Sequence, residues 1–111
     1  MIYRIGTPVM PSILDFLSNR DKESPRMRGE DWLLYSGISV FETRGQAEAL
    51  RDRIQRHQGR DVYEVPLPPG FGFMIARTRR TPGHHTLWGR PQDLLMLTLD
   101  KAGYPVDREH W

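Results

Sequence analysis

The chain has 111 residues, carries a net charge of only +2 and contains no cysteine. This length supports one compact domain and excludes two domains with separate cores. The lack of cysteine excludes disulfides, thiolate nucleophiles and cysteine-ligated zinc. No apolar run reaches the roughly 18 residues that span a bilayer, and no leader pattern follows Met1. We therefore expect a soluble, cytoplasmic protein that does not enter membranes.

Arginine supplies 14 of the 16 basic residues. Its planar guanidinium suits phosphate and carboxylate groups, although the codon usage of a GC-rich genome produces the same bias. The distribution is more informative than the total, because segment 65–92 contains no acidic residue while it holds Arg77, Arg79, Arg80 and Arg90. This segment is a candidate surface for phosphate or nucleic acid.

Strands and helices are expected to alternate over the first part of the chain. Residues 2–6 alternate in polarity and end at a glycine, which is typical of a strand, with Arg4 on the face opposite its apolar neighbours. We place this strand at or near the centre of a sheet. Ser12 and Asp15 have capping-box spacing and predict a short helix of about two turns. The polar segment 18–30 is expected to be a mobile loop.

The middle of the chain predicts a buried strand followed by the most regular helix. The sequence Ile-Ser-Val-Phe at 38–41 is typical of a buried strand. Thr43 and Gln46 form a second capping-box pair at the start of a helix that runs to about residue 57. Its apolar residues recur at spacings of three and four; they are Ala47, Leu50 and Ile54.

Three strands and one helix are expected in the second half. Residues 62–67 alternate with period two, and residues 71–76 follow a Pro-Pro-Gly turn, so these segments predict a hairpin. The proline within the first segment indicates that this strand lies at a sheet edge or ends there, since proline cannot donate to a ladder. A further strand is expected at 84–88, then an apolar helix at 91–101 that opens on proline. Residues 104–111 are expected to form a tail.

This order of elements predicts a single α+β domain over residues 1–111. The sheet is expected to be mixed or mainly antiparallel, with about five strands and two or three helices.

The adjacent histidines His84 and His85 are the first candidates for chemistry. No metal is expected, because adjacent residues on a strand point to opposite faces and no HxxxH or HExxH pattern occurs. Imidazole titrates near neutrality, so either histidine can act as a general base or bind a substrate, or can be structural. Trp88 on the same strand can stack on a base or a sugar ring, or belong to the core. No serine lies in a GxSxG motif, which leaves a hydrolase without support.

Three short segments follow one another between residues 2 and 55. They are Tyr3-Arg4-Ile5, Asp15-Phe16-Leu17-Ser18, and Gly37-Ile38-Ser39-Val40-Phe41, the last of which precedes Thr43 and Gln46-Ala47. In these features the chain resembles small bacterial proteins related to the ADP-ribosyltransferase fold. The resemblance implies NAD as the cofactor, with Arg4 at its ribose or phosphate and Ser39 at its nicotinamide end.

The same family carries a glutamate on a late strand, and this chain has no acid at 71–76 or 84–88. The resemblance therefore implies one of two outcomes. Either His84 or His85 has a binding role, as in phosphate-transferring relatives, or transferase activity has been lost.

Three functions follow from these patterns. The first is an ADP-ribosyltransferase-like domain, active or degenerate, acting on NAD or a related nucleotide, with the histidine pair as catalytic groups and Arg4, Ser39 and Trp88 at the cofactor. The second is a nucleic-acid-binding module that uses the arginines of segment 65–92. The third is a noncatalytic partner protein, such as an antitoxin, an immunity protein or an accessory subunit, whose arginines face an acidic protein surface.

Overall fold

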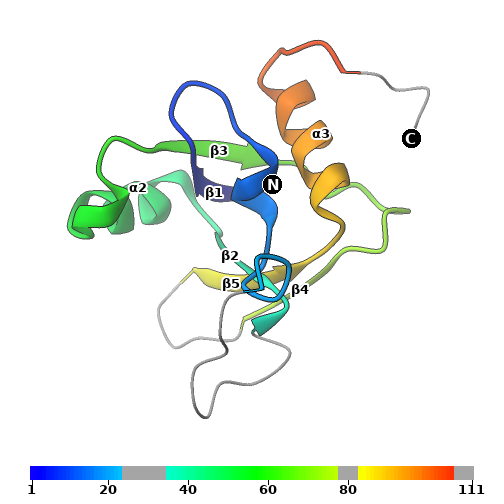
Figure 1. Ribbon diagram of the computed structural model, residues 1–111, viewed down its shortest axis with the longest axis horizontal. Coiled ribbons are helices and arrows are strands. Elements are labelled where there is room, and N and C mark those ends of the chain that lie inside the picture. Colours follow the sequence, from blue (N-terminus) through cyan, green and yellow to red (C-terminus); the bar gives the residue numbers. More distant parts are fainter. Residues whose placement is uncertain (24–34, 78–82, 107–111) are drawn as a thin grey trace.

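A computed structural model describes residues 1–23, 35–77 and 83–106. Five strands form one antiparallel sheet in the order β3-β1-β2-β5-β4 (Figure 1). The strands are β1 (Ile2–Gly6), β2 (Ile38–Phe41), β3 (Asp61–Val65), β4 (Met74–Ala76) and β5 (His84–Trp88). The helical elements are η1 (Ile13–Phe16), α2 (Arg44–Arg53), η2 (Gln55–His57) and α3 (Pro91–Lys101). The predicted α+β class and five-stranded, mainly antiparallel sheet are confirmed.

The sheet separates two hydrophobic clusters, because successive side chains of a strand point to opposite faces. The larger cluster packs η1 and α3 against one face; its buried members are Ile2, Phe16, Ile38, Val40, Val65, Leu87 and Leu94. The smaller cluster packs α2 against the other face; its buried members are Ile5, Phe41, Ala47 and Val62. Arg4 lies between Tyr3 and Ile5 in β1 and therefore shares the face of the larger cluster, as predicted.

The predicted capping box of α2 is present in full. The Gln46 N–H donates to Thr43 Oγ1 at 3.2 Å, and the Thr43 N–H donates to Gln46 Oε1 at 3.1 Å. Two free donors at the helix start are thereby satisfied. The prediction of one helix to residue 57 was wrong, because Ile54 has an extended backbone that separates α2 from η2.

The first predicted helix is shorter than expected. Instead of two α-helical turns, η1 is a single 3-10 turn that ends at Phe16, and Leu17 is already extended. The Asp15 carboxylate does accept from the Ser12 N–H, at 2.7 Å, as its spacing predicted.

The predicted hairpin between the third and fourth strands was wrong. β3 and β4 lie at opposite edges of the sheet, and the chain between them crosses from one edge to the other. β4 is also shorter than the predicted segment 71–76, since Gly70 and Gly72 have φ of +94° and +74° and turn the chain before Met74. Both conformations favour glycine, so the Pro-Pro-Gly-Phe-Gly sequence redirects the chain instead of reversing it.

The final helix has the predicted limits, Pro91 and Lys101, and buries Leu94, Leu97 and Leu99. Within the three described ranges, no helix combines the length and apolarity needed to cross a bilayer. The predicted loop at 18–30 lies outside the described residues from position 24 onward, and the predicted tail does so from position 107.

Candidate functional site

Arg4 holds η1 onto the sheet. Its Nε donates to the Asp15 carbonyl at 2.9 Å and its Nη1 donates to the Ser39 carbonyl at 2.7 Å. Burial lowers the pKa of Arg4 to about 10, an effect that the charge of Asp15 opposes. The guanidinium is therefore cationic at neutral pH, and it joins β1, β2 and η1 through backbone carbonyls.

The Asp15 side chain organises the chain between β1 and η1. This buried carboxylate accepts from the Thr7 N–H at 3.0 Å, from Thr7 Oγ1 at 2.9 Å and from the Ser12 N–H at 2.7 Å. A buried carboxylate is stable only when its oxygens are paired in this way. Arg4 and Asp15 together form a structural unit at this end of the sheet.

The residues predicted to bind NAD are divided between the two faces of the sheet. His85 pairs with Val40 and so shares Arg4's face; its Nδ1 lies 3.2 Å from the Gly83 carbonyl oxygen. By alternation along β2 and β5, Ser39, His84 and Trp88 lie on the α2 face. There the His84 ring stacks on Phe41 at 5.1 Å. None of these residues lines the surface hollow at the β3 edge of the sheet or the surface hollow beside β4.

The predicted phosphate-binding arginines fall into two groups. Arg77 and Arg90 are exposed, and Arg90 Nε lies 3.8 Å from an oxygen of Asp93. Arg79 and Arg80 lie outside the described residues. Among the residues that are described, no three His, Asp or Glu side chains gather in a way that could hold a metal ion.

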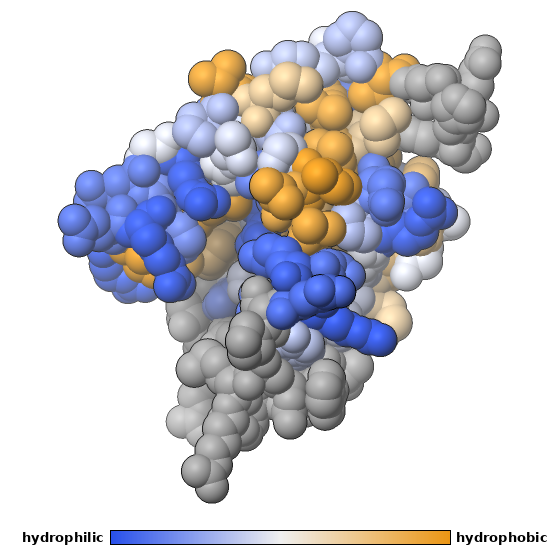
Figure 2. Space-filling model, in the orientation of Figure 1, coloured by the Kyte–Doolittle hydropathy of each residue, from blue (hydrophilic) through white to orange (hydrophobic). Residues whose placement is uncertain are grey.

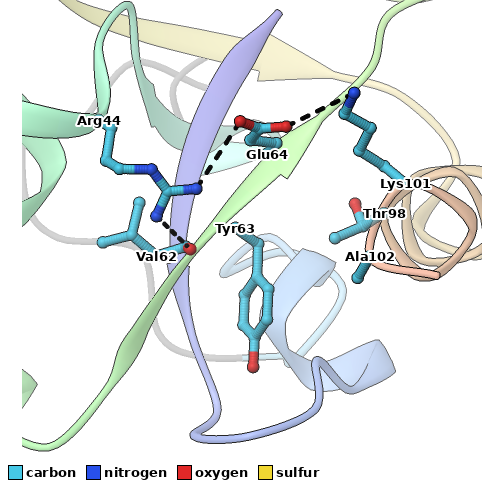
Figure 3. Close-up of a pocket in the computed structure, with 7 residues that line it drawn as sticks. All are labelled: Arg44, Val62, Tyr63, Glu64, Thr98, Lys101 and Ala102. Carbon is cyan, nitrogen blue, oxygen red and sulfur yellow. Dashed lines mark hydrogen bonds and ion pairs between the residues drawn. The ribbon is translucent and has the colours of Figure 1, made fainter. Parts of the chain in front are cut away.

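A hollow of about 260 Å³ with a mixed polar and apolar lining lies at the β3 edge of the sheet (Figure 3). Glu64 lies between two cations there, 3.8 Å from Arg44 Nη2 and 3.8 Å from Lys101 Nζ. Arg44 Nη1 also donates to the carbonyl oxygen of Val62 at 3.1 Å. Side chains from α2 and α3 thus lie over this edge, and Arg44 occupies one of its backbone carbonyls. Covering an edge is one way in which proteins prevent it from pairing with another strand.

At the opposite edge, β4, no comparable side-chain cover is found among the residues that the structure describes. All three of its residues are exposed, including Met74 at 62% and Ile75 at 43%. β4 pairs with β5 on its inner side, and no strand in the described ranges pairs with its outer side. It carries neither a charge nor a proline, two of the devices that protect an exposed edge, and its length of three residues is the one such device that it has.

An apolar hollow of about 340 Å³ lies beside β4. Its lining comes from the connection to β4 and from β4 itself: Leu67, Pro68, Pro69, Gly70, Gly72, Phe73 and Ile75. The Phe73 ring packs on the larger cluster and stacks on Phe71 at 5.5 Å. Ile75 pairs with Leu87 and so lies on the same face as that cluster. The open edge is therefore bordered by an apolar depression.

Exposed apolar residues also occur elsewhere on the molecule. Figure 2 shows hydrophilic residues over α2 and apolar residues near the centre of the same view. Besides those of β4, the large apolar side chains exposed within the described ranges are Met1, Val9, Met10 and Leu14. These four lie in turns, at the chain start or in the single turn of η1 and not along an open strand.

The β4 edge was not predicted from the sequence, because residues 71–76 were paired in a hairpin with residues 62–67 and the edge position was assigned to residues 62–67. The uncharged run Met74-Ile75-Ala76 next to a Pro-Pro-Gly sequence was the available signal. No family model, no curated protein and no solved structure matches the chain.

His57 predicts a pH dependence of stability. Burial, followed by the charges of Arg56, Arg60 and Arg4, lowers its pKa, and its Nδ1 is buried with no hydrogen-bond partner among the described residues. The unfolded chain, with an ordinary pKa of about 6.5, therefore binds a proton at a pH where the folded protein does not.

We expect the folded state to lose stability as the pH falls below about 6.5, until the folded His57 is also protonated. Urea unfolding of the wild type and of His57→Gln at pH 7 and pH 5 tests this. The wild type should lose more stability than the variant. Equal losses in both proteins would exclude His57 as the cause.

Proposed function

We propose that the protein is a noncatalytic partner protein that binds an extended segment of another protein by adding it to the sheet beside β4. In this mode of recognition, backbone hydrogen bonds supply affinity and pockets for alternate side chains supply specificity. The observation that supports the proposal is the difference between the two sheet edges. Arg44 and Lys101 cover β3, whereas β4 exposes Met74 and Ile75 beside an apolar hollow.

An NAD-dependent transferase has less support from the same geometry. A cofactor-binding arginine needs N–H groups directed at a phosphate, whereas Arg4 already bonds two backbone carbonyls. The resemblance also requires Arg4 and Ser39 to act on one ligand, and their side chains belong to opposite faces of the sheet.

Selection of peptides from a displayed library of random linear decapeptides tests the proposal without a known partner. The library is selected against the wild type and then measured on Ile75→Lys and Met10→Lys. Lysine on an edge strand opposes the addition of another strand. Met10, at 47% exposure, matches Ile75 at 43% but lies in the loop after β1.

We expect peptides that bind the wild type and Met10→Lys equally and bind Ile75→Lys at least tenfold more weakly, a loss of about 1.4 kcal/mol. Both variants should melt within a few degrees of the wild type, because surface substitutions change stability by about 0.5 kcal/mol or less. Selected peptides that bind Ile75→Lys as well as the wild type, or a library that yields no binder, would contradict the proposal.

A further inference from the structure

We infer, on the basis of the proposed function, that the segment added beside β4 is acidic and has apolar side chains at alternate positions. The inference rests on the charges at the two ends of β4 and on the hollow beside it. It concerns the chemistry of the partner, which edge exposure alone does not specify.

Positive charge lies at both ends of β4. Arg77 directly follows its last residue, Ala76, and is exposed. At the other end, a Cβ on Gly89 would lie 2.4 Å from the Phe73 ring, so the chain just after β5 is in contact with the chain just before β4. Arg90 follows Gly89, and its side chain is 74% exposed.

The stretch of chain that carries these two arginines is poor in acidic residues. Segment 65–92 contains no Asp or Glu. Arg90 Nε lies 3.8 Å from Asp93 Oδ2 in the first turn of α3, and the Asp93 side chain is only 18% exposed. A strand laid along β4 would therefore meet the exposed guanidinium of Arg77 near one end and that of Arg90, which Asp93 partly compensates, near the other. This arrangement favours carboxylates in the added strand.

The apolar hollow beside β4 is the reason to expect apolar side chains at alternate positions of the partner segment. Side chains of an added strand alternate between the two faces of the sheet. On the larger-cluster face they would lie beside Phe73 and Ile75 and fill the apolar hollow; on the other face they would lie beside Met74. The partner should therefore place apolar residues at every second position.

Two other occupants fit less well. A second copy of this chain, paired β4 to β4, would bring the same arginine-bearing, acid-free edge against itself. Single-stranded nucleic acid would satisfy the arginines, but the exposed side chains of β4 itself, Met74 and Ile75, offer no flat ring for a base to stack on. The rings beside β4, Phe71 and Phe73, already stack on each other. Both serve as outcomes of the test.

The test uses two synthetic decapeptides, one alternating valine with glutamate and one alternating valine with lysine, and a ten-nucleotide oligothymidylate. Binding of each fluorescent probe is measured by anisotropy at low and at moderate salt. The proteins are the wild type, Ile75→Lys, the double variant Arg77→Gln/Arg90→Gln, and Arg53→Gln/Arg56→Gln as a control with two exposed arginines changed near the end of α2.

We expect the glutamate peptide to bind the wild type about tenfold more tightly than the lysine peptide, because Arg77 and Arg90 attract the glutamates of the first peptide and repel the lysines of the second. The preference should shrink in Arg77→Gln/Arg90→Gln, persist in Arg53→Gln/Arg56→Gln and weaken as salt rises. The protein itself should elute as a monomer at the concentrations used.

The possible failures are distinguishable. If both peptides bind equally and both are lost in Ile75→Lys, the strand-adding edge stands and the acidic partner is excluded. If binding does not depend on Ile75, the proposed function fails as well. Oligothymidylate binding that depends on Arg77 and Arg90 but not on Ile75 overturns the inference in favour of nucleic acid, and a dimer that Ile75→Lys dissociates overturns it in favour of a second copy.

Discussion

Replacing Arg4 by methionine is expected to lower the melting temperature of the protein in the absence of any ligand. Arg4 donates to the backbone carbonyls of Asp15 and Ser39, and its removal leaves both without this donor. Two unsatisfied, partly buried carbonyls cost about 2–4 kcal/mol. For a domain of this size, that loss corresponds to a decrease of roughly 10–20 °C, which thermal denaturation followed by circular dichroism measures directly.

Arg56→Met is the matched control, because Arg56 is an exposed arginine of η2. It should melt within a few degrees of the wild type, since exposed substitutions change stability by about 0.5 kcal/mol or less. A wild-type melting temperature for Arg4→Met would show that Arg4 is not structural and would return it to the ligand-binding role that the sequence resemblance implied. The comparison therefore separates the two roles of this residue.

Gly83→Ala is expected to have a similarly large effect at the start of β5. Gly83 has φ of +75°, and a Cβ there would lie 1.9 Å from Gln46 Oε1, the oxygen that caps the start of α2. The left-handed backbone costs a residue other than glycine about 1–3 kcal/mol, and loss of the cap adds about 1 kcal/mol. We expect a total loss of about 2–4 kcal/mol in urea unfolding.

Gly59→Ala is a control that isolates the backbone term. Gly59 has φ of +81°, but a Cβ there meets no atom within 4 Å. Gly59→Ala should therefore cost only the strain of the left-handed conformation, and Gly83→Ala should cost more by the amount of the displaced cap. Equal losses for the two variants would mean that the contact with Gln46 has no energetic consequence.

Local patterns predicted most of the fold. The alternation in β1 placed Arg4 on the correct face, the Thr43–Gln46 pair placed the start of α2, and Pro91 placed the start of α3. Each of these features depends on residues within a few positions of one another. Capping, alternation and the fixed φ of proline act over that range.

The order of the strands was not predictable in the same way. The Pro-Pro-Gly sequence marks a change of chain direction, but it does not specify which strand the next strand pairs with. β4 pairs with β5 and not with β3, a choice that depends on long-range packing of Phe73 and Leu87 on the larger cluster. The error concealed the open edge. A hairpin would pair the 71–76 strand with the 62–67 strand, and the edge position had been assigned to the 62–67 strand.

The candidate site was affected by the same limitation. Residue types singled out Arg4, Ser39, His84 and His85, but their shared location depended on which face of the sheet each side chain occupies. The alternation in β2 and β5 divides them between two faces. Conversely, Met74 and Ile75 carry no chemistry that a motif would reveal, and only their exposure at a sheet edge identifies them.

Amide hydrogen exchange at Met74, Ile75 and Ala76, measured with and without the peptide that alternates valine and glutamate, tests the central claim most directly. A strand added beside β4 forms backbone hydrogen bonds with its outer side, so exchange within β4 should slow at saturating peptide, while exchange in β3 on the covered edge stays unchanged. Saturation of the protein with peptide and no slowing at any of the three β4 amides would contradict the account.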